Sequence, residues 1–407
     1  MQMVKKSVGM ALWFMFLTLP LMVVRVNTLK NVVEWRWWSM LYVGIGAFFL
    51  SLLWQWGLQR KARASKRQEH GETALPPNWT QRLQEDPKTY QPVLLVLALF
   101  ALAFPWLFDA HQINIMVLAL IFVVLGLGLN ISVGLAGLLD LGYVAFFAIG
   151  AYTYGLLHSY FGLGFWLCLP LGGAVGALLG ILLGFPILRL RGDYLAIVTL
   201  GFGSITKIVL ENWDEVTHGA QGIANIPRPG LFGIDMHLEA GTTYIYYLML
   251  LLVLGTIFVT NRLKDSRIGR AWMALREDEI ACVAMGIDMA RTKLSAYALG
   301  AFWAGLVGVL FAARNTYIHP NSFTFMESAV VLSIVVLGGM GSILGVIIAA
   351  LVMILLPEYL RAFSEYRMLV FGAVMVLMMV FRPQGLIADT RRKYEAQTLG
   401  AGEGGDA

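Results

Sequence analysis

Long apolar runs separated by short polar segments are the dominant pattern along the chain. A helix that crosses about 30 Å of hydrocarbon needs roughly 20 apolar residues, so each run predicts a membrane-spanning helix. Because several runs are short, the pattern predicts about ten to twelve spans. The runs lie at residues 8–24, 38–57, 92–108, 113–131, 143–160, 164–185, 194–210, 243–260, 294–313, 328–339, 341–356 and 368–381.

The composition agrees with an all-α, polytopic membrane protein. Hydrophobic residues make up 58% of the chain and charged residues 14%, and the mean hydropathy is +0.70. Soluble domains carry roughly 25% charged residues. Cys168 lies in an apolar run and Cys282 in a charged loop, so a disulfide between them is not expected.

Lys and Arg concentrate in alternate loops, and this asymmetry predicts the orientation of the bundle. Basic residues are abundant at 58–91 and 261–293 and in the C-terminal tail, whereas the loop 211–242 is mainly acidic. Basic loops stay on the cytoplasmic side. Threading twelve spans therefore places both termini in the cytoplasm, and the basic loop 25–37 is the one segment that disagrees.

Four regions are predicted along the chain. Residues 1–57 form a two-span extension, and residues 58–91 form a charged cytoplasmic linker. Residues 92–388 form the main bundle. The glycine-rich tail 389–407 has a composition typical of disorder.

A four-step ladder of glycines marks one face of the run 164–185. Spans associate through small residues because these let two backbones approach closely. We therefore expect helix packing at this face, although sliding surfaces in a moving transporter would use the same residues. The ladder consists of Gly172, Gly176, Gly180 and Gly184.

Glycine-rich breaks interrupt the apolar runs at 126–143 and 335–345, with a smaller candidate at 199–207. Irregular backbone inside a bilayer must be buried in protein or line a watery cavity, and interrupted helices often mark transport sites. A transport path and close packing explain the breaks equally well. The second break also suggests that 328–339 and 341–356 are one broken element. The path candidates are Asn130, Asp140, Gly201, Gly203, Gly338 and Gly339.

Asp140 is the most specific of these candidates. An ionisable group at membrane depth is a functional hypothesis by default. The alternative is a hydrated carboxylate at the cytoplasmic interface between two spans, and we favour that alternative.

Motifs of enzymes and of nucleotide binding are absent from the sequence. It contains no GxxxxGK[ST] phosphate loop, no HExxH zinc motif and no GxSxG nucleophile turn. The centres of the spans are almost free of charge, whereas a proton-coupled transporter carries acids there. We expect a transport subunit that is not an enzyme, holds no metal or cofactor, binds no nucleic acid and receives its energy from another protein.

The segment 266–288 predicts an amphipathic, water-facing helix between two spans. Ser266 can cap its start, and Gly286 can end it in a left-handed turn. A helix lying on lipid headgroups through Trp272 is one interpretation. The acidic cluster 277–279 would be repelled by anionic lipid, so a protein partner fits the mixed charge better.

Four sequence blocks, in order, resemble a known family. The resemblance is to the LivM-type permease subunits of bacterial ABC importers for branched-chain amino acids, and it covers about residues 92–388. The blocks are GDYLAIVTLGFG (192–203), RIGRAWMALREDEIACVAMGI (267–287), SFTFMESAVVLSIVVLGGMGS (322–342) and RPQGLI (382–387).

The resemblance implies that 266–288 is the cytoplasmic coupling loop, which docks in a groove of an ATPase subunit. Compared with the family pattern, the glycine lies one place later than usual. The residues that the resemblance assigns to coupling are Arg270, Glu277, Glu279, Ala281 and Gly286.

The resemblance further implies an assembly in the bacterial inner membrane. Its members would be this chain, a second LivH-type permease, two ATPase subunits that bind ATP and Mg²⁺, and a periplasmic binding protein. The substrates would be leucine, isoleucine and valine. The alternative class is a secondary amino-acid transporter driven by an ion gradient, and a membrane-bound transferase is a third.

Overall fold

The computed structural model describes residues 24–27, 32–35, 99–187, 190, 192–230, 238–359, 372, 376 and 385–387. The chain divides into two units, Met1–Glu85 and Asp86–Ala407. The expected spans 8–24, 38–57 and 368–381, the linker 58–91 and the tail 389–407 lie almost entirely outside the described residues.

In the first unit, the described residues form a short antiparallel hairpin. Strand β1 (Val24–Asn27) pairs with β2 (Val32–Trp35). The hairpin begins at the end of the expected span 8–24 and lies mainly in the basic loop 25–37. Val, Trp and Val-Val at these positions are residues that favour strands.

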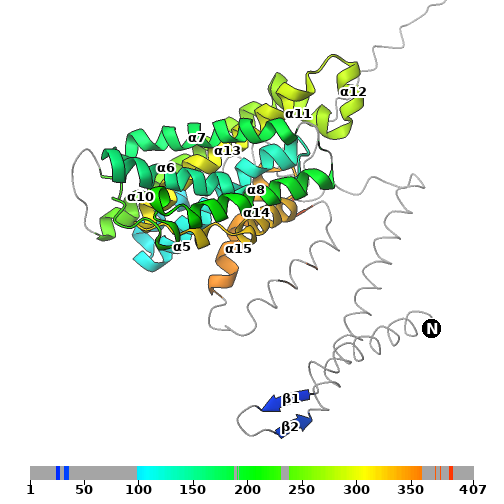
Figure 1. Ribbon diagram of the computed structural model, residues 1–407. Helices are drawn as coiled ribbons and strands as arrows, with labels where there is room; N and C mark the ends of the chain where they lie inside the picture. Colours follow the sequence, from blue (N-terminus) through cyan, green and yellow to red (C-terminus); the bar gives the residue numbers. More distant parts are fainter. Residues whose placement is uncertain are drawn as a thin grey trace, which may run out of the picture. The chain divides into compact units, whose positions relative to one another are not determined.

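The named secondary-structure elements that the structure describes in the second unit are all helices (Figure 1), and loops and one isolated β-bridge, Ile223 with Ile318, lie between them. Residues 99–107 are helical and precede the first labelled helix. The elements that follow are α5 (Ala110–Leu129), η2 (Asn130–Leu135), α6 (Val144–Phe161), α7 (Phe165–Ile187), α8 (Asp193–Asn212), α9 (Asp214–Thr217), η3 (Gly219–Gln221), α10 (Leu238–Lys264), α11 (Arg267–Glu277), α12 (Glu279–Ala284), α13 (Met289–Asn315), η4 (Pro320–Ser322), α14 (Phe325–Gly338) and α15 (Ile343–Tyr359).

Six segments of the described chain are long and apolar enough to cross a membrane, and Ile343–Glu358 is a shorter apolar helix. The prediction of a polytopic helical bundle is therefore confirmed. The total of ten to twelve spans and the cytoplasmic termini stay predictions. The six segments are Ala110–Leu135, Phe165–Pro186, Tyr194–Asn212, Gly241–Lys264, Met289–Asn315 and Pro320–Gly338.

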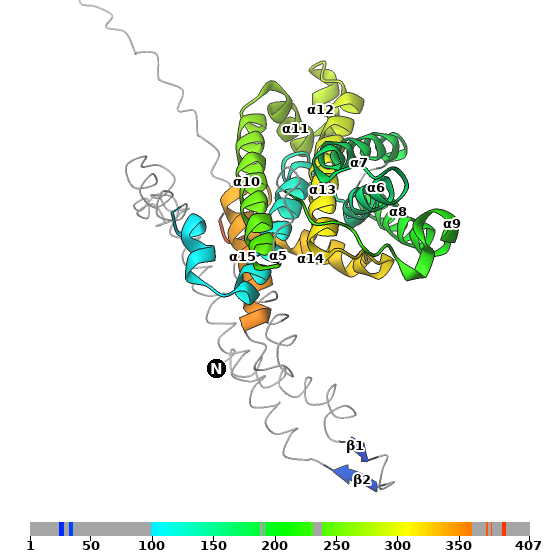
Figure 2. The same cartoon turned by 90° about the vertical axis from the view of Figure 1, so that its left-hand side faces the viewer.

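Helix α13 lies at the centre of the bundle, between α5, α6 and α7 (Figure 2). Glycines make this close packing possible. A Cβ added at Gly150 of α6 would collide with the backbone of Gly305 in α13, and a Cβ added at Gly305 would collide with Gly172 of α7. Because there is no side chain at these crossings, the three backbones touch directly.

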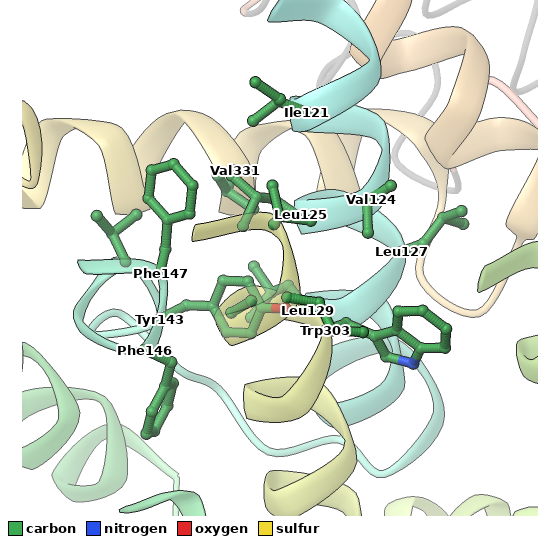
Figure 3. Close-up of a cluster of buried hydrophobic side chains, with 14 of the residues drawn as sticks. Ile121, Val124, Leu125, Leu127, Leu129, Tyr143, Phe146, Phe147, Trp303 and Val331 are labelled. Atoms are coloured by element: carbon green, nitrogen blue, oxygen red, sulfur yellow. The ribbon is translucent and has the colours of Figure 1, made fainter. Parts of the chain in front are cut away.

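The core between α5, α6 and α13 consists of large apolar and aromatic side chains (Figure 3). Tyr143 precedes α6 and points into this core, where its hydroxyl donates to the carbonyl oxygen of Gly300 at 2.9 Å. Its ring packs beside Leu129, and Trp303 lies nearby on α13. This hydrogen bond satisfies the hydroxyl, which would be costly to bury alone.

The predicted break at 126–143 contains two kinds of irregular backbone. Helix α5 continues directly into η2, which is a π-helix. A non-helical segment follows and returns the chain to α6, and Gly137 in it has φ +72°. A π-helical turn is rare and occurs mostly inside α-helices, often at functional sites.

The break at 335–345 separates α14 from α15. Gly339 and Gly341 have φ of +108° and +89°, values that residues with a Cβ rarely adopt. The predicted break at 199–207 is wrong, because α8 runs without interruption through Gly201 and Gly203. Two glycines spaced two apart lower helix propensity but do not break a helix that packs on its neighbours.

Candidate functional site

Helices α11 and α12 project at one end of the bundle (Figure 1). The prediction of one helix over 266–288 is wrong, because Asp278 has an extended backbone (φ −155°, ψ 111°) and divides it in two. Its carboxylate accepts hydrogen bonds from the N–H groups of Ile280 and Ala281 at 2.8 and 3.1 Å and so starts α12. The predicted caps are confirmed: Ser266 accepts from the N–H of Gly269, and Gly286 has φ +81° after α12.

Helix α11 is fastened to α13 by its apolar face. Trp272 is fully buried, and its indole N–H lies 3.1 Å from the carbonyl oxygen of Thr292 and 3.0 Å from the hydroxyl of Ser295. Trp272 therefore does not lie on lipid headgroups. A displacement of α11 would act directly on the first turns of α13.

Helix α12 is joined to α13 by an ion pair. The Glu279 carboxylate lies 2.7 Å from Lys293 Nζ, and the Lys293 side chain is 1% exposed. Cys282, on the same helix, is also buried. The structure thus directs Glu279, assigned to coupling from the sequence, towards the bundle.

The opposite face of α12 is apolar and open. Ile280 is 71% exposed, Val283 54% and Met285 82%. Ala281 and Gly286 are exposed beside them. Exposed apolar side chains gathered at one site are typical of a surface that another protein covers.

The two remaining coupling candidates lie on α11. Arg270 is exposed and donates to the carbonyl oxygen of Asp265 at 2.9 Å. Glu277 is exposed in the last turn of the helix. Glu277, Glu279, Ala281 and Gly286 therefore lie on or next to α12, whereas Arg270 lies in the first turn of α11.

The two glycine-rich breaks meet at Asn130. Its side-chain oxygen accepts a hydrogen bond from the N–H of Gly341 at 2.9 Å, across 211 residues of sequence. Its amide nitrogen is buried and has no hydrogen-bond partner among the described residues. From the other side, Lys264 Nζ lies 3.3 Å from the carbonyl oxygen of Gly341.

Gly338 and Gly339 belong to the same junction. A Cβ added at Gly338 would be 2.6 Å from the backbone nitrogen of Val346, so α14 and α15 touch there. The N–H of Leu386 donates to the carbonyl of Leu337 at 2.8 Å, and Gly385 lies against Gly339. Residues 385–387, the described part of the RPQGLI block, therefore pack on this break.

The expectation of a hydrated Asp140 is wrong. The residue is 2% exposed, and its carboxylate accepts the N–H of Gly142 at 2.9 Å. Asp140 belongs to the non-helical segment between η2 and α6, and this segment packs against the bundle. Burial raises the pKa of the Asp140 carboxyl above its ordinary value, and the hydrogen bond from Gly142 opposes that rise.

Gly203 lies against the segment that contains Asp140, whereas Gly201 faces open space among the described residues. A Cβ added at Gly203 would be 3.1 Å from the Cα of Gly142, and the Thr199 hydroxyl accepts the N–H of Leu141 at 3.0 Å. A Cβ at Gly201 would meet nothing within 4 Å among the described residues. The path candidates thus form two neighbouring groups, around Asn130 and around Asp140, with Gly201 on the open face of α8.

The glycine ladder of α7 faces α13 along its length. Added Cβ atoms would be 2.6 Å from the carbonyl oxygen of Ala301 at Gly176 and 2.8 Å from the Ala301 Cβ at Gly180. At the two ends, Gly172 lies against Val309 and Gly184 against Leu294. The ladder is the surface on which α7 and α13 approach each other.

Residues 112–379 match the family model described as branched-chain amino acid transport system / permease component. This segment is more than half of the chain. The chain belongs to this family.

Curated relatives extend the comparison. The permease is 50% identical over 344 residues to the high-affinity branched-chain amino acid transport system permease protein LivM of Escherichia coli K12, with 79% of this chain and 81% of that protein covered. It is 50% identical over 325 residues to LivM of Salmonella typhimurium, with 75% and 76% covered. LivH of Salmonella typhimurium is 24% identical over 297 residues, with 69% and 95% covered. No solved structure gives a significant match.

Sequence reasoning missed two basic residues of the permease. Lys293 counted only as a loop charge for orientation, and Arg276 only as part of the polar face of α11. Lys293 forms the ion pair with Glu279, and Arg276 donates to the carbonyl of Gly134. For Lys293 the sequence did contain a signal. The residue lies within the first turns of a long apolar helix, where a charged side chain needs a partner.

Proposed function

We propose that the chain is the transmembrane permease subunit of an ATP-driven ABC importer that moves leucine, isoleucine and valine across the bacterial inner membrane. Family membership and the 50% identity to LivM proteins over about three quarters of the chain support this substrate class. The short helices at the end of the bundle support a subunit that receives its energy from a partner.

The open face of α12 is the observation that carries the coupling role. Ile280, Val283 and Met285 project away from the bundle, while Trp272 and Glu279 hold the same two helices to α13. A surface that only had to remain in water would not expose three large apolar side chains on so short a helix. An ATPase groove that covered this face would push on α13.

The substrate path runs between this chain and a second, LivH-type permease. The 24% identity to LivH proteins supports a pair of related subunits facing each other. Helix α8 is the least buried of the six spans and exposes Ser204 beside Gly201. Polar and small residues on an exposed span favour protein or water over lipid as its surroundings.

The rest of the assembly follows from this role. Two ATPase subunits bind ATP and Mg²⁺ on the cytoplasmic side, and a periplasmic protein delivers the amino acid. The complete chain has about ten to twelve spans with both termini in the cytoplasm. Much of the selectivity lies in the binding protein, since the spans offer few polar groups to a zwitterion.

Reconstitution with the four partner proteins in lipid vesicles tests the proposal. We expect uptake of radiolabelled leucine that requires ATP and continues when ionophores collapse the ion gradients. A matched preparation with an ATPase subunit deficient in hydrolysis serves as the control. Gradient-driven uptake by this chain alone, without ATP, would instead establish a secondary transporter.

A further inference from the structure

Arg276 connects the last turn of α11 to the end of η2. Its guanidinium donates to the carbonyl oxygen of Gly134, 142 residues away in sequence. Its side chain also covers Gly137, where an added Cβ would be 2.8 Å from Arg276 Cγ. Carbonyl groups in the last turn of a helix lack partners within that helix, and a cation is favourable beside them. Arg276 therefore stabilises the C-terminal end of η2.

Gly134 in turn lies against the junction of the two broken helices. An added Cβ there would be 2.6 Å from the backbone nitrogen of Gly341 and would collide with Asn130 Oδ1. Asn130 itself is bonded to that same nitrogen. Because no side chain lies between Gly134 and Gly341, a movement of one backbone displaces the other.

The junction is also the place where the path candidates converge. Gly341 follows the break after α14, and Lys264 at the end of α10 reaches its carbonyl oxygen. The segment after η2 leads within a few residues to the buried Asp140. Arg276 thus contacts the irregular backbone between α5 and α6 directly. Through Gly134 it is connected to the break between α14 and α15.

We propose that Arg276 is a positioning residue that transmits the movement of α11 to the π-helical turn η2 and, through Gly134, to the break at Gly341. The inference rests on the proposed function, because it takes the ATPase subunits as the source of that movement. It gives the bundle a second input besides the contacts of Trp272 and Glu279 with α13. The two inputs act on different helices.

The test compares Arg276→Ala and Arg276→Lys with the wild-type complex in vesicles. The control is Arg291→Ala, since Arg291 lies at the same end of the bundle and pairs only across the surface with Asp288 at 3.1 Å, its side chain being 89% exposed. Three quantities are measured: ATPase subunits retained on purification, ATP hydrolysed, and leucine transported. The wild-type preparation shows separately whether ATP drives uptake at all, which decides the proposed function.

We expect Arg276→Ala to retain its ATPase subunits and to hydrolyse ATP while transporting about tenfold less leucine per ATP, as loss of one charged hydrogen bond would give. Arg276→Lys should recover part of the transport, because an ammonium can still donate to Gly134. Transport equal to that of Arg291→Ala would overturn the inference. Loss of the ATPase subunits would also overturn it, since Arg276 would then be a docking contact.

Gly137→Ala provides a second variant, in which Arg276 is not substituted but its side chain must move. Its φ of +72° and its contact with Arg276 mean that a methyl group must displace the arginine. We expect the same fall in leucine transported per ATP. If Arg276→Ala fails to accumulate in the membrane, normal coupling in Gly137→Ala would overturn the inference, and reduced coupling would support it.

Discussion

The Glu279 carboxylate lies 2.7 Å from the Lys293 ammonium, and the two partners differ in exposure, at 23% and 1% of their side chains. The pair joins a short helix at the end of the bundle to the most central helix. Because one partner is fully buried and the other is partly exposed, the two partners of the ion pair are not equivalent.

Removing either partner of this pair should have unequal effects. Glu279→Gln leaves an ammonium buried without its counter-charge, a situation that costs about 3 kcal/mol. Lys293→Met leaves the carboxylate of a side chain that is 23% exposed, so the loss of stability should be smaller. Thermal unfolding in detergent measures the order. In the double variant Glu279→Gln/Lys293→Met, stability should return close to that of Lys293→Met, and equal losses in both single variants would contradict the argument.

The exposed face of α12 should determine how firmly the ATPase subunits are retained. Ile280→Ser with Met285→Ser removes two exposed apolar side chains, each worth about 1.5–3 kcal/mol when buried in an interface. We expect at least about tenfold weaker retention of the ATPase subunits on purification, with unchanged amounts of permease in the membrane. Met326→Ser is the matched control, because Met326 is 67% exposed but follows the far end of α13. Equal retention in both variants would remove α12 from the docking surface.

The contact of α7 with α13 should not tolerate a larger side chain in place of a ladder glycine. At Gly176 an added Cβ would be 2.6 Å from the carbonyl oxygen of Ala301, so Gly176→Leu forces the two helices apart. We expect a strong fall in folded protein, measured as the monodisperse fraction after extraction in mild detergent. Gly255→Leu is the control, since a Cβ there meets nothing within 4 Å among the described residues. Normal folding of Gly176→Leu would show that the helices can separate without loss of the fold.

Because Asp140 is buried, its side chain must provide the acceptor for the N–H of Gly142, which water could otherwise supply. Asp140→Asn keeps an oxygen that accepts the N–H of Gly142, so we expect near-normal stability and transport. Asp140→Leu leaves that N–H buried without a partner, at a cost of about 1–3 kcal/mol. The melting temperature in detergent distinguishes the two variants. A large loss of transport in Asp140→Asn at normal stability would show that the carboxylate itself acts in the path.

The positions of the long apolar helices followed from hydrophobic patterning, because a span must be apolar over its whole length. The run 294–313 became α13, which is longer at both ends, and the run 164–185 became α7 with nearly the same bounds. The caps at Ser266 and Gly286 were equally predictable, since each depends on one residue and its neighbours.

Long-range relationships were not predictable from local pattern. Asp140 lies in the segment between η2 and α6, which packs on α8 through Leu141 and Thr199, and no spacing rule predicts that packing. Asp278 was counted as a surface charge, yet its side chain starts a new helix. Glycines at 201 and 203 resembled those at 339 and 341, but only the latter have backbone angles that require glycine. Composition identifies where a break is possible, and tertiary contacts decide whether it forms.

The burial of Cys282 has a practical consequence. The chain has two cysteines, and both are buried as free thiols. Cys282 is on α12, so a thiol reagent can reach it only when that short helix moves away from the bundle, whereas Cys168 lies in the first turn of α7. The rate of alkylation at Cys282 therefore measures how often α12 separates from the bundle. It can be followed in the unsubstituted permease during turnover.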